Sequence, residues 1–536
     1  MSHSAPNRTN RRRAVSALAL VGALALSGCG LPGSGPSEAD TLHVLAGSEV
    51  RDMEPILEEM ARETGVHIEF EYMGTLDGTE SLLDLGDDAP WDATWFPSNS
   101  YFSLFPEGDQ LVRTETSIMR SPVVLGVKAD KAAGVGWTGG TQPTWAEVVD
   151  EIDAGRLTYG MTSPISSNSG FTTLVQAATA LSGTGTVLES ADIAAVTEPL
   201  TEFAHGQELT SGSSGWLADR FIETPDAVDA IFNYESVLAQ ISVEGQPLQV
   251  VIPSDGVVTS DYPFTLLRAA SDEKAELYQT AVEYLMRDEV QQQIADQTFR
   301  RTNVSAADAQ IQTFELPFPA RLETVQQLLE VWLSEVRKPA SMVFAIDTSG
   351  SMADGTRMSD LRDSIRVLSG QQASGSEGFL RLKPRERIVL IEFAEAEKSR
   401  LEVDVPSDDA GVRRAMDQIN ERIDTYQPVG GTEIYGTVAD ALEAAAAEAD
   451  PARISSVVLF SDGEDTGVVG PDEFQRWYED RAARDEVFAS IPVFAIVFAD
   501  ADFEEMEHLA ELTGGRAFDV GSDSLVSVFR EIRGYL

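Results

Sequence analysis

Residues 343–352 read VFAIDTSGSM, an apolar run that ends in an aspartate and continues through two serines with a glycine between them. The first four residues are apolar at every position, which is typical of a buried parallel strand. Asp347, Ser349 and Ser351 follow where this strand ends. Because open α/β sheets bind ligands at the carboxyl ends of their strands, we expect these oxygens at such an edge. A carboxylate and two hydroxyls so close together suit a small hard cation such as Mg²⁺ or Mn²⁺.

The region around this stretch alternates apolar strands with helical patterns over residues 340–536. This alternation predicts a doubly wound α/β domain. We expect further strands at 387–393, 454–460, 491–498 and 516–520, helices at 358–368, 411–423, 503–512 and 525–532, and an alanine-rich helix that ends at 449. Two more oxygen-bearing side chains, Thr432 and Asp462, are also expected at strand ends in this domain.

The order Asp-x-Ser-x-Ser, then Thr, then Asp resembles the metal-ion-dependent adhesion site (MIDAS) of von Willebrand factor A (vWA) domains, with residues Asp347, Ser349, Ser351, Thr432 and Asp462. The resemblance implies that the hydroxyls ligate a divalent cation and that the aspartates often act through water. The cation would be Mg²⁺, or Mn²⁺ or Ca²⁺ in its place, and its open position would attract an acidic residue of a protein partner. Glu433, Glu464 and Asp465 beside the motif either favour Ca²⁺ or are solvated loop charges.

Residues 41–315 also alternate strands with helices, in a pattern that predicts two α/β halves. We expect strands at 42–46, 66–72, 91–96, 121–127, 157–161, 230–234 and 248–252. This organisation resembles the bacterial extracellular solute-binding proteins of ABC transporters, type II periplasmic binding proteins whose two lobes close like a hinge on a ligand. The resemblance implies ligand contacts from loops at strand ends, at Ser48, Ser166, Ser167, Asn168, Ser169, Asn233, Tyr234 and Glu235.

The loop at 163–170 supports two interpretations. Hydroxyls and backbone N–H groups at the start of a helix suit a small anionic solute or oxyanion. Serine and asparagine are also preferred helix caps, which need no ligand. Beyond these two lobes, an amphipathic helix at 322–336 is expected within a connection at 316–339 that leads to the C-terminal domain.

The N-terminus has the features of an export signal. Residues 1–13 carry four arginines and no acidic residue, and a short, mainly apolar run follows at 14–26. The sequence LSGC at 26–29 resembles the lipobox of bacterial lipoproteins, which implies that Cys29 becomes lipid-modified, with palmitate for example, and begins the mature chain. We therefore expect a signal peptide at 1–28, a flexible tether at 29–40 and a lipid-anchored protein on the extracytoplasmic face of the cell membrane. The arginines at 11–13 leave Sec and twin-arginine export both open.

Composition excludes some function classes. The 536 residues carry a formal net charge of −49, which argues against nucleic acid as a partner. Cys29 is the only cysteine, the five histidines lack zinc-site spacing, and none accompanies the three loops, so we expect binding and no catalysis.

Two hypotheses about function remain. In the first, the vWA domain binds a protein partner through its metal, and the solute-binding-like domain acts as a sensor or presenting module. In the second, the chain is the substrate-binding lipoprotein of an ABC-type uptake system, and the vWA domain is a docking module.

Overall fold

The computed structural model describes residues 37–304, 314–369, 381–450, 452–463, 465–498, 503–520, 528–529 and 532–533. Cys29, the signal peptide predicted at 1–28 and Glu464 lie outside the described residues, as do most of the predicted tether and most of the helix predicted at 525–532. Among the helices that are described, none is both long enough and apolar enough to cross a bilayer.

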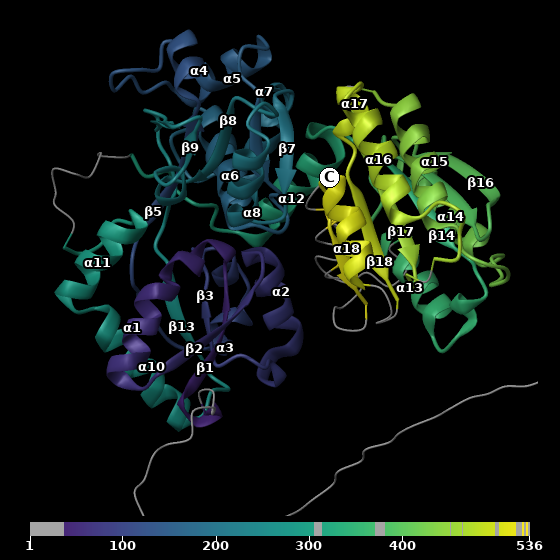
Figure 1. Cartoon of the computed structure of the whole chain (residues 1–536). Coiled ribbons are helices and arrows are strands. Elements are labelled where there is room, and N and C mark those ends of the chain that lie inside the picture. Colours follow the sequence, from purple (N-terminus) through teal and green to yellow (C-terminus); the bar gives the residue numbers. More distant parts are fainter. Residues whose placement is uncertain are drawn as a thin grey trace, which may run out of the picture. The chain divides into compact units, whose positions relative to one another are not determined.

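The first lobe is built around a five-stranded sheet of order β2-β1-β3-β13-β4 (Figure 1). β1 (Thr41–Ala46) pairs in parallel with both of its neighbours, as the predicted βαβ pattern requires. β13 (Pro263–Leu267) pairs antiparallel with β3 and β4 and was not predicted. The other elements are β2 (His67–Tyr72), β3 (Ala93–Trp95), β4 (Val112–Ser117), α1 (Glu54–Thr64), α2 (Thr75–Leu85), α10 (Asp272–Leu285) and α11 (Asp288–Thr298).

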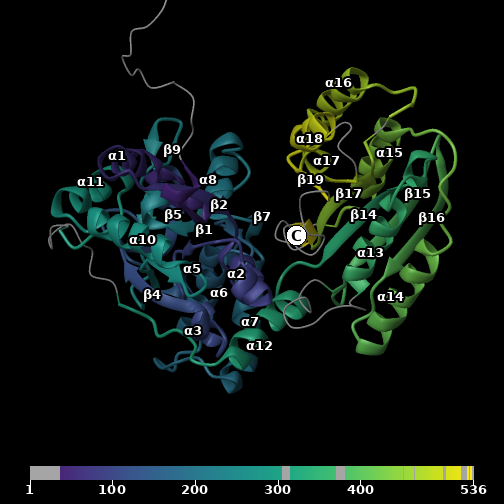
Figure 2. The same cartoon turned by 90° about the horizontal axis from the view of Figure 1, so that it is seen from below.

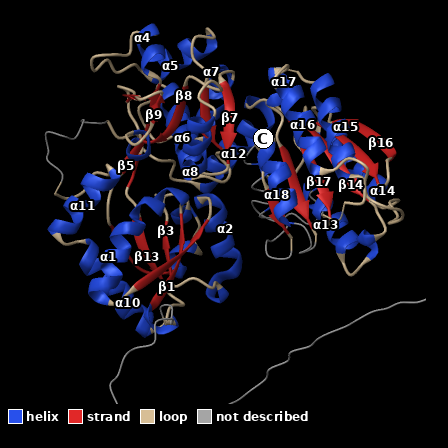
Figure 3. Ribbon diagram, viewed as in Figure 1, coloured by secondary structure: helices blue, strands red, loops and turns tan. Residues whose placement is uncertain are grey.

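The second lobe has a sheet of order β11-β5-β8-β6-β7, with β12 paired to β5. Figure 3 labels β5, β7 and β8 of this sheet. Trp145 anchors its core, because the indole stacks on Phe232 with centroids 5.5 Å apart and donates to the Gly256 carbonyl at 3.0 Å. The elements are β5 (Ser121–Val127), β6 (Tyr159–Thr162), β7 (Gln207–Ser211), β8 (Ala230–Tyr234), β11 (Gln249–Val251), β12 (Thr259–Ser260), α4 (Ala129–Gly134), α5 (Trp145–Asp153), α6 (Asn168–Leu181), α7 (Ser190–Ala204), α8 (Ser214–Glu223) and α9 (Glu235–Leu238).

The helix predicted at 322–336 is present as α12 (Leu322–Val331) followed by a π-helical turn, η6 (Trp332–Val336). Its apolar face, which includes Val325, Leu328 and Trp332, is buried in the same hydrophobic cluster as Trp145 and Phe232. The connection between the two parts of the chain therefore contributes to the core of the second lobe.

The C-terminal domain is a six-stranded sheet of order β16-β15-β14-β17-β18-β19, parallel except for β16. Alternate residues of β14 enter separate cores, so that Phe344 packs with α13 and α14, and Val343 packs with α15, α16 and α18. Figure 2 shows the two helix groups on opposite faces of the sheet. The elements are β14 (Ala340–Asp347), β15 (Arg387–Phe393), β16 (Glu397–Asp404), β17 (Ile454–Ser461), β18 (Val493–Val497), β19 (Ala517–Asp519), α13 (Arg357–Ser369), α14 (Asp409–Ile423), α15 (Ile434–Ala447), α16 (Pro471–Ala482), α17 (Glu486–Ala489) and α18 (Phe503–Leu512).

This architecture confirms the predicted doubly wound domain, although β16, α16 and α17 were not predicted. β16 reads EKSRLEVD and lies at the edge of the sheet, where most of its side chains are at least partly exposed. An edge strand of this kind needs no continuous apolar run, and charged residues protect its open side from further pairing. For this reason the apolar runs that reveal β14, β15 and β17 give no signal for β16.

Candidate functional site

The loop after β14 forms the centre of the candidate metal site. Asp347 is the last residue of the strand and is fully buried. Its Oδ1 accepts the Ser349 backbone N–H at 2.7 Å, which turns the chain so that the next hydroxyls face the same way. The Ser349 and Ser351 hydroxyl oxygens lie 3.1 Å apart. The first three predicted residues are thus gathered at the carboxyl end of the central strand.

Two other loops meet this one. Asp462 follows β17 directly, and β17 is the parallel neighbour of β14. The loop that carries Thr432 is bonded to the β14 loop, because Gly350 N–H donates to Gly430 O at 2.9 Å and Val429 N–H donates to Thr348 O at 2.8 Å. These contacts bring the parts of the chain that carry all five predicted residues to one edge of the sheet.

The expectation that Thr432 follows a strand is wrong. It lies in the loop between two helices, α14 and α15. Gly430 in this loop has a φ of 102°, a conformation that L side chains rarely adopt, and a Cβ atom on Gly350 would lie only 3.2 Å from the Gly430 oxygen. The glycines let the two loops come close, so a helix-to-helix connection reaches the site without a strand.

The two aspartates are held in different ways. The second Asp347 oxygen, Oδ2, accepts the Ser461 hydroxyl at 2.7 Å. Burial raises the pKa of Asp347 to about 6, and the nearby negative charge of Asp462 adds to the rise, although the bonds from Ser461 and Ser349 oppose it. Asp462 is fully buried, and its Oδ2 accepts Arg357 Nη1 at 2.9 Å.

This donor set fits a small hard cation. Oxygens in adjacent positions of an octahedral Mg²⁺, with bonds of about 2.1 Å, lie about 3.0 Å apart. The two serine oxygens are 3.1 Å apart, so they match adjacent ligand positions without rearrangement. In the part of the chain that the structure describes, no group of three or more His, Cys, Asp or Glu side chains could hold a metal. A site here would therefore depend on hydroxyl oxygens as well as carboxylates.

The neighbouring acidic residues have structural partners. The carboxylate of Glu433 accepts the backbone N–H groups of Val468 at 2.6 Å and Val469 at 3.2 Å. Asp465 accepts the backbone N–H of Ile434, the first residue of α15, at 2.9 Å. These bonds favour a loop-fixing role for the two side chains over direct cation binding.

A second candidate site lies in the N-terminal part of the chain. Two helices, α6 and α8, begin after the N-cap residues Ser167 and Ser213, and neither serine makes a side-chain cap bond. Ser166 directly precedes the N-cap of α6, and Ser213 is the N-cap of α8. Both hydroxyls are buried without a hydrogen-bond partner among the described residues. Unpartnered hydroxyls beside helix N-termini are suited to binding a polar solute.

Comparison with known families agrees with both parts of the fold. Residues 42–300 match the model of the family described as bacterial extracellular solute-binding protein. Residues 342–464 match the model of the von Willebrand factor type A domain. The chain joins a bacterial extracellular solute-binding domain to a vWA domain. The second match spans the β14 loop, Thr432 and Asp462.

Several solved structures are similar to part of this chain. The periplasmic binding protein P5PA is 15% identical, with a TM-score of 0.42, over 55% of this chain and 99% of its own. AfuA from Actinobacillus pleuropneumoniae, solved with fructose-6-phosphate, is 13% identical, with a TM-score of 0.40, over 55% of this chain and 98% of its own. A periplasmic thiamin binding protein is 12% identical, with a TM-score of 0.44, over 56% of this chain and 99% of its own. No curated protein sequence gives a significant match.

Most of the predicted solute contacts in the solute-binding domain have protein partners. Asn168 donates to the Tyr234 hydroxyl at 3.0 Å, Asn233 donates to Ser214 O at 2.9 Å, and Glu235 forms an ion pair with Arg301 at 2.9 Å. The Ser169 hydroxyl bonds those of Thr162 and Ser214 at 2.8 Å, and the Ser48 oxygen accepts Gly215 N–H at 3.3 Å. Ser167 Oγ lies 3.5 Å from Ser169 Oγ, and Ser166 is the predicted residue whose hydroxyl has no such partner.

Two residues were missed by sequence reasoning. Ser213 caps α8 after β7, a strand that reads QELTS and has no apolar run to reveal it. The sequence SGSS at 211–214, which resembles the loop at 166–170 in its small polar residues, was the available signal. Arg357 was missed because its distance from Asp462 along the chain gives no indication that the two meet.

Proposed function

We propose that this protein is an extracytoplasmic, lipid-anchored binding protein whose vWA domain holds a divalent cation and, through it, a carboxylate of a protein partner. The main support is the meeting of three loops that bring Asp347, the Ser349–Ser351 hydroxyl pair and Asp462 to one sheet edge beside the Thr432 loop. We propose binding and no catalysis. The solute-binding domain would act as a sensor or as the module that presents the metal site.

The chemistry of the donors supports a charged partner. Ser349, Ser351 and Thr432 contribute neutral hydroxyls, so they would neutralise little of the charge of Mg²⁺, Mn²⁺ or Ca²⁺. When bound, the cation would supply a Lewis-acidic position for an outside oxygen. The chain's own residues would hold the cation and orient that position outward, while Asp347 stays fixed by Ser461 and by the Ser349 N–H. An Asp or Glu side chain is the protein group with the charge and geometry to complete the site.

A co-purification experiment tests the metal-dependent partner. The full chain would be immobilised and exposed to detergent-solubilised cell envelope from its own host, in MgCl₂ or in EDTA. We expect a protein retained in MgCl₂ and lost in EDTA, and lost equally when Ser349→Ala and Ser351→Ala are combined. Ser359→Ala, which removes a hydroxyl of α13 bonded to Thr356 O, is the matched control and should retain the protein. Retention of the same proteins in EDTA and by the double variant would contradict the proposal.

The proposed anchor rests on Cys29. We expect Cys29→Ala to move the protein from the membrane fraction to the soluble fraction, because a lipid-modified cysteine and a tether are the proposed attachment. Fractionation of cells with a blot for the protein measures this. Ser27→Ala, two residues away, should stay in the membrane fraction. Membrane retention of the Cys29→Ala chain would rule out lipid anchoring at this residue.

The alternative function is solute capture for an ABC-type uptake system, with the vWA domain as the docking module. One observation favours it, namely the buried Ser166 and Ser213 hydroxyls without hydrogen-bond partners among the described residues. A small polar or anionic solute would accept bonds from both. This alternative predicts that the co-purified partner is a transporter component.

A further inference from the structure

Arg357 places a permanent positive charge within the candidate metal site. Its Nη1 donates to Asp462 Oδ2 at 2.9 Å and to the Ser351 backbone oxygen at 3.1 Å. The arginine thereby joins two of the three loops that meet there. The planar guanidinium carries several N–H donors, so one arginine can bond a carboxylate and a backbone carbonyl at the same time.

The position of Arg357 in its helix is unfavourable by itself. It is the first residue of α13 (Arg357–Ser369), where the helix dipole presents positive charge and disfavours cations. Arginine at this position therefore requires another source of stabilisation. The fully buried Asp462 carboxylate supplies it, because a buried carboxylate without a cation carries a large desolvation cost.

The same contact opposes a metal ion. A divalent cation held by the serine and threonine hydroxyls with help from Asp462 would lie close to the guanidinium, and like charges at such distances repel strongly. The Arg357 side chain is 22% exposed, so it can turn toward water when the ion arrives. Binding of the ion would then include the loss of the Arg357–Asp462 ion pair.

We infer that Arg357 is a built-in counter-cation of the metal site, which neutralises Asp462 when no ion is bound and weakens the affinity for divalent cations by competing for that carboxylate. This inference rests on the proposed metal site and adds a residue that sets its affinity. Arg357 makes the site responsive to the ion concentration, because an ion that must displace a resident charge binds less tightly than one that meets a free carboxylate.

The test compares the full chain with three variants by calorimetric titration with MgCl₂ and by thermal melting in EDTA. Arg357→Gln removes the charge, Arg357→Lys keeps it, and Arg362→Gln removes an arginine of the same helix that bonds the Tyr426 and Ile423 carbonyls and no site carboxylate. We expect Arg357→Gln to bind Mg²⁺ about tenfold more tightly or better. Its melting temperature in EDTA should fall, and Mg²⁺ should restore it. Arg357→Lys should stay nearer the wild-type affinity, and Arg362→Gln should match it.

Each outcome decides the inference. If the wild-type chain binds Mg²⁺ and Arg357→Gln binds it equally or more weakly, the inference is wrong and the proposed metal site stands. If Arg357→Gln binds Mg²⁺ and the wild-type chain does not, the inference holds and the proposed function of the wild-type site fails. If neither binds, both are wrong. Should Arg357→Gln fail to fold by circular dichroism, Arg357→Ala takes its place: tighter Mg²⁺ binding than that of Arg362→Gln supports the inference, and equal or weaker binding contradicts it.

Discussion

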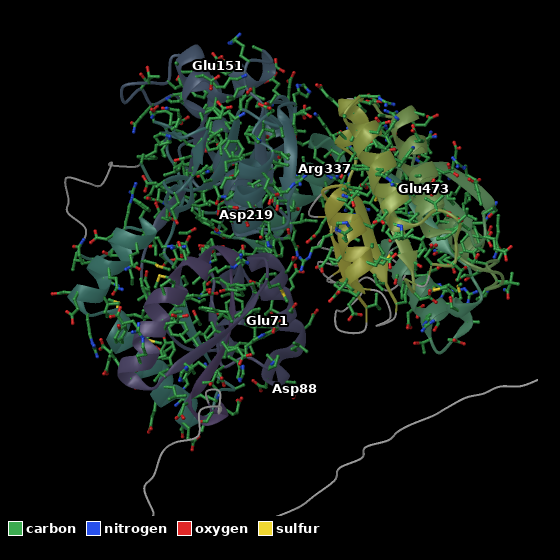
Figure 4. All side chains as sticks on the ribbon, in the orientation of Figure 1. Glu71, Asp88, Glu151, Asp219, Arg337 and Glu473 are labelled. Carbon is green, nitrogen blue, oxygen red and sulfur yellow. The ribbon has the colours of Figure 1, made fainter. Side chains whose placement is uncertain are left out.

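Replacing Glu386 with glutamine is expected to lower the free energy of unfolding of the vWA domain by about 3–5 kcal/mol. Glu386 is fully buried, and its Oε1 lies 2.7 Å from Arg337 Nη2 and 2.5 Å from Arg533 Nη1. Both guanidiniums are themselves buried, and Arg337, at the end of η6, is labelled in Figure 4. An amide would leave two buried cations without their shared carboxylate, which is more costly than loss of an exposed ion pair.

The effect of Glu386→Gln should depend on pH. Burial alone would raise the pKa of Glu386, but the Arg533 and Arg337 guanidiniums outweigh it and hold the pKa below its usual value. A carboxylate with a lowered pKa stabilises the folded state above its unfolded pKa, and this contribution is lost as the pH falls through the folded value. The difference between wild type and Glu386→Gln should therefore be full at neutral pH and shrink below about pH 4.

Urea denaturation followed by fluorescence at several pH values measures this difference. Glu402→Gln is the matched control, because Glu402 of β16 pairs with Arg387 at 2.9 Å but its side chain is 52% exposed. The control should change stability by less than about 1 kcal/mol. Equal small effects of the two variants, or a Glu386→Gln effect that does not change in acid, would contradict the assigned role of Glu386.

Much of the fold followed from apolar runs. The strand at 343–346 and its neighbours at 387–393 and 454–460 were found because central parallel strands are buried on both faces and carry apolar residues at nearly every position. The edge strands β4 and β16 were missed because their exposed faces carry charged and polar residues. β13 reads PFTLL and was missed because a proline within so short an apolar run argues against a central strand.

The candidate site was predictable to a different degree in each domain. The motif from Asp347 to Ser351 lies within five residues, so the sequence alone predicts that these side chains lie close together. The order of this motif, Thr432 and Asp462 along the chain identified the other two site residues. The position of Thr432 in a loop between two helices was not predictable, because a pair of glycines indicates a turn but not whether helices or strands lie on either side of it. In the solute-binding domain, Asn168 and Asn233 looked like ligand contacts, yet their amides bond other residues, and only tertiary structure distinguishes these cases.

The second large effect concerns Asp347. Asp347→Ala is expected to abolish Mg²⁺ binding by the vWA domain, because this carboxylate fixes the Ser349 N–H and the Ser461 hydroxyl and provides one of the two negative charges of the site. Asp363→Ala is the control, since Asp363 lies on α13 in the same domain and pairs with Arg366 at 3.0 Å. Asp363→Ala should bind Mg²⁺ as the wild type does.

Calorimetric titration of the full chain with MgCl₂ tests the metal site most directly. About 0.15 M NaCl should be present, so that weak association of Mg²⁺ with the acidic surface is screened. We predict one saturable Mg²⁺ site per chain for the wild type and for Asp363→Ala, and none for Asp347→Ala. An unchanged titration of Asp347→Ala, or the absence of a saturable site in the wild type, would contradict a divalent-cation site at the carboxyl end of β14.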